Sequence, residues 1–305
     1  GNIGSIQAAN PLIGLLSDTT DKVRIAAVCS LGEIGSITAI EPLLALMQDD
    51  NAEVRAAVIV ALSQMPDPRA FAPIVISLFD ADDEVRRNAA AAIGNLGDER
   101  ALQPLVECLN DPYYWVRANA SWSLGKLKLV AATQHLVELL ATEADEVVLA
   151  NTLTALGNLA TAEAMSAVTA ALRDESNTEK TRIAAMLAIA DHCDTIDVPC
   201  ALDERQLREV SIVILNLLRK APEDELRATA SWSLGRLHLT EGMADALIAA
   251  LTDDYEWVRY YAVESLALLG IKDALPTIEQ LMESSSDKHL LDVGAKALRI
   301  LSGEQ

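Results

Sequence analysis

The chain has 305 residues, of which 51% are hydrophobic and only 4% aromatic, and its formal net charge is -21 at pH 7. Such an excess of carboxylates repels phosphate backbones and anionic lipid surfaces, so we expect neither nucleic acid nor membrane insertion. The scarcity of rings predicts a core of alanine, leucine, valine and isoleucine, whose small side chains let helices approach closely.

The cysteines and the hydropathy pattern indicate the compartment. Cys29, Cys108, Cys193 and Cys200 are too few and too scattered for a disulfide framework, which favours a reducing cytoplasm. No run of about 18 apolar residues occurs, and the N-terminus lacks a basic segment followed by an apolar one. We therefore expect a cytoplasmic protein.

The first half of the chain repeats itself every 31 residues. The dipeptide Val-Arg and a proline recur at this spacing, and a period of this length is typical of a two-helix unit. The dipeptides are Val23-Arg24, Val54-Arg55, Val85-Arg86 and Val116-Arg117, and the prolines are Pro11, Pro42, Pro73 and Pro104.

Later units keep the pattern, although other residues replace the valine or the arginine. The pattern predicts about nine repeats in one domain over residues 1–305. Their equivalents of Val-Arg are Val148-Leu149, Thr181-Arg182, Leu226-Arg227, Val258-Arg259 and Leu290-Leu291. A polar segment at about 191–203, which includes Pro199, predicts one inserted loop.

Within each unit the second helix follows the template Val-Arg-x-x-Ala-x-x-Ala-Leu-Gly-x-Leu, as in residues 116–127. An acidic residue precedes the valine by five positions, for example Asp49, Asp80 and Asp111. We expect these carboxylates to cap the second helices. The arginine after each valine is spaced to reach the acid of a neighbouring unit, which predicts a ladder of ion pairs along the array.

These motifs resemble the HEAT repeats of the phycobilisome-lyase type over nearly the whole chain. The resemblance implies an all-α fold, a right-handed α-α superhelix or solenoid of the HEAT/armadillo type. That repeat class occurs in bilin lyases, phycobilisome-degradation factors and adaptors without enzymatic activity, so the resemblance is specific for fold and leaves activity open.

Aromatic residues gather in a few units, and these are the predicted partner-binding region. The segment Ala-Ser-Trp-Ser-Leu-Gly occurs twice and places Trp122 and Trp232 at the same position of two helices. On the inner, concave face of a HEAT array these rings could grip a partner; alternatively, each fills a gap between adjacent repeats. The neighbouring candidates are Tyr113, Tyr114, Trp115, Tyr255, Trp257 and Tyr260, although Trp115 and Trp257 could instead cover a helix start.

A column of amides forms a second candidate. Asn88, Asn119 and Asn151 each follow the valine column by three positions, and they could bind a ligand or, as we favour, pair with one another. Arg87, beside Asn88, joins the candidates as a basic residue near the same surface.

Catalytic and metal-binding patterns are missing from the sequence. Phosphate-binding glycine loops, nucleophile elbows and dinucleotide fingerprints do not occur. His192, Cys193 and Cys200 offer at most three ligands at an unusual spacing for zinc, so we expect no metal site. HEAT enzymes that bind iron through His-Glu pairs differ from this chain, which contains no His-Glu dipeptide.

The function predicted from these observations is a non-enzymatic scaffold that binds a protein partner with a basic or helical surface on its concave helix face, without a cofactor. The alternative is a protein that handles a bilin, similar to the bilin lyases. A tetrapyrrole would then lie against the aromatic rings, and Arg87, Lys126 and Arg236 would hold its propionates, although the surrounding negative charge opposes such a ligand.

Overall fold

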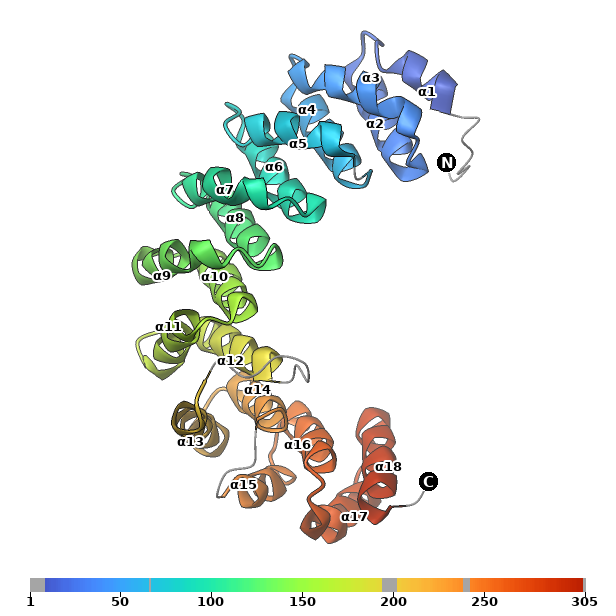
Figure 1. Ribbon diagram of the computed structural model, residues 1–305. Helices are drawn as coiled ribbons and strands as arrows, with labels where there is room; N and C mark the ends of the chain where they lie inside the picture. Colours follow the sequence, from blue (N-terminus) through green and yellow to red (C-terminus); the bar gives the residue numbers. More distant parts are fainter. Residues whose placement is uncertain (1–8, 66, 194–201, 238–241, 304–305) are drawn as a thin grey trace. The chain divides into compact units, whose positions relative to one another are not determined.

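The computed structural model describes residues 9–65, 67–193, 202–237 and 242–303, and every regular element in these ranges is a helix. The chain forms two compact units, Gly1–Ala155 and Leu156–Gln305, and each is described by itself. In both, helices pair in chain order, with the first helices of the pairs on one side and the second helices on the other (Figure 1).

The first unit contains five first helices and their partners. The first helices are α1 (Ala9–Leu15), α3 (Ile40–Ala45), α5 (Pro68–Ser77), α7 (Leu102–Cys108) and α9 (Thr133–Thr142). The second helices are α2 (Asp21–Ile34), α4 (Ala52–Ser63), α6 (Asp83–Leu96), α8 (Tyr114–Lys126) and α10 (Glu146–Leu159), which contains the boundary between the units. Short 3-10 turns flank some of the first helices: η2 (Ile37–Ala39), η3 (Leu46–Gln48), η4 (Glu99–Ala101) and η5 (Val130–Ala132).

The second unit continues the pattern with four more pairs. The first helices are α11 (Ala162–Arg173), α13 (Glu204–Lys220), α15 (Met243–Ala250) and α17 (Leu275–Ser284), which η6 (Lys272–Ala274) precedes. The second helices are α12 (Glu179–Cys193), α14 (Asp224–Leu234), α16 (Glu256–Leu268) and α18 (Lys288–Ser302). The described residues therefore contain nine helix pairs, as the repeat period predicts.

The predicted inserted loop at about 191–203 lies mostly on residues 194–201, which are outside the described ranges. On its two sides, α12 ends at Cys193 and α13 begins at Glu204, after the N-cap Asp203. Whether the whole chain is a single domain stays a prediction.

The second helices form the core of each unit, because they pack on their own first helix and on neighbouring second helices, as α6 packs on α5, α4 and α8. In α8 the residues Val116, Ala118, Ala120, Ser121 and Leu124 are completely buried, so burial is not limited to one stripe. Small side chains are required at such a helix, since three neighbours approach it. This close packing leaves little room for large rings, which explains the low aromatic content of the chain.

The predicted ladder of ion pairs is present in both units, in the loops before the second helices, but it does not run along the whole array. Leu149 and Leu291 replace the arginine, and Arg182 Nε donates to the carbonyl of Leu172 at 3.4 Å in place of a carboxylate. Arg86 Nε donates to Asp111 Oδ2 at 2.7 Å and its Nη2 donates to Asp111 Oδ1, while its Nη1 donates to the carbonyl of Asp80 at 2.9 Å. Each arginine thus joins its own loop to the carboxylate of the next repeat. The other pairs of this kind are Arg24 with Asp49, Arg55 with Asp80, Arg117 with Glu143 and Arg227 with Asp253.

The ladder acids differ from the prediction in one respect, because they are not the N-caps of the second helices. Asp111 Oδ1 accepts the N–H of Tyr113, and it is Tyr113, two residues later, that is the N-cap of α8. In α4 the cap is likewise Asn51 rather than Asp49. Arginine binds both oxygens of the ladder carboxylate. The carboxylate still accepts one N–H in the turn before the helix, but it does not cap the first N–H groups of the helix.

Candidate functional site

The predicted aromatic residues lie at two equivalent places, the start of α8 in the first unit and the start of α16 in the second. Tyr113 is the N-cap of α8 and its hydroxyl donates to Glu84 Oε1 at 3.3 Å; Tyr255 is the N-cap of α16 and its hydroxyl donates to Glu225 Oε1 at 2.8 Å. In each case the tyrosine bridges to the preceding second helix. These two phenols therefore stabilise the stacking of repeats, whatever else they contact.

Next to these caps the rings touch one another. Tyr114 contacts both Tyr113 and Trp115, with ring centroids 5.4 and 5.2 Å apart. In α16 the rings of Trp257, Tyr260 and Tyr261 contact each other at 5.3 to 6.0 Å, and the Trp257 side chain is 40% exposed. The structure thus brings the predicted aromatic candidates together within each cluster, and it leaves part of the second cluster accessible.

Trp122 and Trp232 are both half-buried and each carries a cation on its ring. Lys126 Nζ lies 4.5 Å from the centre of the Trp122 ring, and the Arg236 guanidinium lies 3.9 Å from that of Trp232. The Trp122 ring also packs over Gly94 of α6, where a Cβ would come within 2.9 Å of Cζ3. Trp122 therefore fills a gap between repeats and still presents a surface, so the two interpretations of this residue are compatible.

The amide column does not pair as expected. Asn119 Nδ2 donates to the carbonyl of Arg87 in the preceding repeat at 3.0 Å, whereas Asn151 Nδ2 donates to Val147 within its own helix at 2.9 Å. Asn119 and Asn151 thus bind main-chain oxygens and not each other's side chains. Asn88 lies in α6 beside Arg87, whose Nη1 pairs with Glu84 one turn away at 3.1 Å.

A hollow in the second unit lies beside the Trp232 site. It has a volume of about 440 Å³ and is formed by the second helices α16 and α18, with Arg236 just after the end of α14. Apolar side chains contribute to its wall, and Leu268 and Ile300 are 58% and 53% exposed. Its polar lining is Arg236, Tyr260, Glu264, His289, Asp292 and Lys296.

Sequence reasoning found Tyr260 and Arg236 but missed the rest of this hollow. Leu268 and Ile300 stand in second helices, where leucine and isoleucine are expected in the core, and only their exposure distinguishes them. Their place outside the recurring Val, Ala and Leu columns is the signal that could have identified them.

The electrostatics of the two clusters favour neutral phenols. Burial and then the nearby Glu84 raise the pKa of Tyr113, and the hydrogen bond to Glu225 followed by burial raises that of Tyr255. Burial, with Glu264 next in size, also raises the pKa of Tyr261. These hydroxyls therefore remain hydrogen-bond donors at neutral pH, and they are poor candidates for proton transfer.

In the described part of the chain, three or more His, Cys, Asp or Glu side chains do not come together in an arrangement that could hold a metal ion. Burial lowers the pKa of His192, which lies at the end of α12 next to Cys193, whereas Cys200 is outside the described ranges. None of the described helices is long and apolar enough to span a bilayer.

The chain is similar in sequence and in fold to known repeat proteins. A family model of HEAT repeats matches residues 9–78, 72–155 and 212–299. No curated protein matches the chain. Among solved structures, an engineered protein superposes with a TM-score of 0.54 at 20% identity, over 96% of this chain and 88% of that one.

Two natural proteins superpose less well. Human deoxyhypusine hydroxylase in complex with glycerol has a TM-score of 0.38 at 22% identity and covers 100% of both chains. The CpcE and CpcF complex of phycocyanin lyase from Nostoc sp. has a TM-score of 0.49 at 21% identity, over 86% of this chain and 94% of that one. At these identities the likeness concerns the fold alone, and the two lower scores support no functional argument.

Proposed function

The chain belongs to the HEAT-repeat family, and from this premise we propose that it is a non-enzymatic scaffold that binds a protein partner on its second helices. Its fold class is the all-α repeat superhelix expected from the sequence. Stacked repeats of this kind present extended surfaces for recognition. The proposal therefore concerns which part of that surface binds and what kind of partner fits it.

The observation that carries the proposal is the hollow formed by α16, α18 and Arg236. Two large apolar side chains, Leu268 and Ile300, stay more than half exposed there, and charged groups surround them. Accessible apolar surface with a polar rim marks an interaction site more often than an accident of packing. A partner helix with apolar residues along one face would bury both side chains.

The charge of the partner follows from the charge of the chain. With a net charge of -21, the field of the protein steers a basic partner toward it and slows an acidic one. Within the hollow, Glu264 and Asp292 can pair with basic residues that flank the apolar face of the partner. We therefore propose an amphipathic, basic helix as the ligand.

Trp122 and Trp232 are proposed as further anchors, each within its own unit. Each ring is half-buried and has a cation on one face, so it is held in place before a partner arrives. A fixed ring loses little side-chain freedom on binding, which is why tryptophan is frequent among residues that dominate interfaces.

The experiment compares two exposed apolar surfaces of the protein. The partner is captured from a lysate of the source organism, purified, and titrated against the double variant Leu268→Asp/Ile300→Asp. We expect binding to weaken by at least about tenfold, since two buried anchors are lost. Ile76→Asp is the matched control, because Ile76 is 68% exposed but lies in the first helix α5.

Equal binding by the double variant and the wild type would reject the hollow as the site. Unchanged urea midpoints of both variants establish that they are folded. Trp232→Ala tests the anchor assignment in the same titration: unchanged affinity would show that this ring serves packing alone.

Handling of a bilin is the second candidate, and one observation favours it. Arg236 lies on the Trp232 ring and also lines the hollow together with His289 and Lys296, so a ring surface and basic groups for propionates stand together. A red-shifted, intensified visible band on mixing with phycocyanobilin, beyond that obtained with serum albumin, would favour this function. No such change would favour the protein scaffold.

A further inference from the structure

The arginine ladder of the second unit reaches Arg259, where the pattern is incomplete. Arg259 Nη1 donates to the carbonyls of Asp253 and Asp254 at 2.6 and 2.9 Å, as in the other repeats. In the five complete pairs among the described residues, Nε and Nη2 hold a carboxylate of the next repeat, and at Arg182 Nε donates to the carbonyl of Leu172. Among the described residues, this edge of Arg259 has no hydrogen-bond partner, although its orientation is fixed by the two carbonyls.

The residue that replaces the acid is Ser285. Its hydroxyl accepts the N–H of Asp287 at 3.1 Å, just as Asp253 Oδ1 accepts the N–H of Tyr255 at 2.9 Å in the preceding repeat. Ser285 therefore keeps the turn that a ladder acid makes, but it has no second oxygen and no charge for the arginine. The substitution removes the carboxylate and leaves the rest of the local structure in place.

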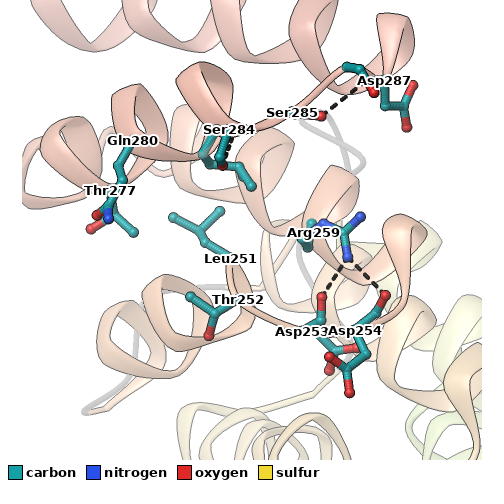
Figure 2. A pocket seen from close by; sticks show the side chains of 12 residues that line it. Leu251, Thr252, Asp253, Asp254, Arg259, Thr277, Gln280, Ser284, Ser285 and Asp287 are labelled. Atoms are coloured by element: carbon teal, nitrogen blue, oxygen red, sulfur yellow. Dashed lines mark hydrogen bonds between the residues drawn. The ribbon is translucent and has the colours of Figure 1, made fainter.

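A pocket of about 610 Å³ occupies the vacated position, and Arg259 lies in its wall. Figure 2 shows the guanidinium between the loop that holds Asp253 and the segment with Ser284 and Ser285, with Thr277 and Gln280 across the opening. The rest of the lining consists of hydroxyl groups, the carboxylates of Asp253, Asp254 and Asp287, and two leucines, Leu251 and Leu281. The hydroxyl and amide groups suit a polar ligand that is larger than a single carboxylate.

We propose that this pocket binds an aspartate or glutamate side chain of a partner polypeptide, which takes the place of the missing ladder acid. A guanidinium presents two parallel N–H groups that match the two oxygens of a carboxylate. The five complete pairs of this chain use that geometry with Asp or Glu. The volume beyond the carboxylate accommodates the adjoining peptide, and the serine, threonine and glutamine groups contact it.

Two of the three aspartates that line the pocket, Asp253 and Asp287, have partners of their own. Both oxygens of Asp253 are bound by Arg227, and Asp287 accepts the N–H of His289 as the N-cap of α18. Their negative field does not prevent the binding of a further carboxylate, because Arg86 holds Asp111 although Asp82 and Asp83 are close to it. The proposal does not depend on the hollow or on the function proposed above.

The test follows the Arg259 Nε–H signal by NMR in the full-length chain with labelled arginine. The probes are acetyl-Gly-Glu-Gly-amide, its Gln counterpart and inorganic phosphate, and Arg259→Gln identifies the signal. We expect the Glu peptide to shift the signal in a saturable manner and the Gln peptide to bind at least about tenfold more weakly. Phosphate should bind more weakly than the Glu peptide.

Ser285→Asp is the decisive variant, because it supplies the acid from within the chain. It should abolish the response to the Glu peptide and raise the unfolding midpoint by about 1–3 °C, as expected when one partly buried pair is completed. Arg208→Gln, which removes an exposed charge in the same unit, should leave peptide binding unchanged. The proposal is overturned if the Glu peptide gives no saturable shift, if Ser285→Asp still responds fully, or if phosphate binds as tightly as the peptide.

Discussion

Gly125 of α8 lies against Ala155 of α10 at a place where the two backbones nearly touch. A Cβ at position 125 would stand 2.5 Å from Ala155 Cα and 2.7 Å from its Cβ. A flexible side chain could move away from such a contact, but a backbone atom of a packed helix cannot do so cheaply. The glycine of the Leu-Gly motif is therefore a packing requirement here.

We predict that Gly125→Ala lowers the free energy of unfolding by about 1–3 kcal/mol, because the second helices α8 and α10 must separate. Urea unfolding followed by circular dichroism measures the change. Gly14→Ala is the control, since a Cβ there meets nothing within 4 Å and alanine favours a helix by up to about 1 kcal/mol. Equal effects of the two substitutions would refute the close-packing argument.

At the scale of elements, the ladder connects each repeat to the next through pairs that are mostly shielded from water. In its five pairs the side chains of both partners are between 7% and 17% exposed. Arg100 and Asp98, by contrast, form an ion pair at the surface, with 70% and 27% exposed. Solvent screens a partly buried ion pair less than an exposed one. The ladder pairs and the Arg100–Asp98 pair therefore contribute differently to stability, although their N–O distances are similar.

A double-mutant cycle on Arg86→Gln and Asp111→Asn should give a coupling energy of about 1–3 kcal/mol, because the pair is bidentate and partly buried. The same cycle on Arg100→Gln and Asp98→Asn should give a clearly smaller coupling energy, because solvent screens the exposed pair. Urea midpoints of the single and double variants provide both values. Comparable couplings for the two pairs would show that burial does not control the ladder.

The ladder was predictable from sequence because it depends on the spacing and the residue type at two positions, an arginine in one repeat and an acid in the next. The caps and the amide contacts were not predictable in this way. Asn119 and Asn151 hold the same position in the repeat but bind different carbonyls, one in the preceding repeat and one in the same helix. The hollow also escaped prediction. A place outside the recurring columns marks Leu268 and Ile300 as candidates, but the packing of the neighbouring helices decides how exposed they are.

At the scale of the whole molecule, two effects of acid oppose each other. Protonation of ordinary carboxylates on lowering the pH reduces the charge of -21 and with it the self-repulsion of the folded chain. The ladder acids respond differently. Burial alone would raise the pKa values of Asp49, Asp80, Glu143 and Asp253, but hydrogen bonds from arginine and from backbone N–H groups hold them below their usual values.

A carboxyl whose pKa is lower in the folded state stabilises the fold above its unfolded pKa of about 4, and this contribution is lost as the pH falls through the folded value. We therefore predict a urea midpoint that stays level or rises slightly from pH 7 to about 5 and falls steeply below about 4. Arg55→Gln should lower the midpoint at pH 7 and make the acid decline shallower, because Asp80 loses the side chain that lowers its pKa. Lys22→Gln, which removes an exposed charge, should run parallel to the wild type. If Arg55→Gln also runs parallel, the ladder does not cause the acid sensitivity, and general charge repulsion does.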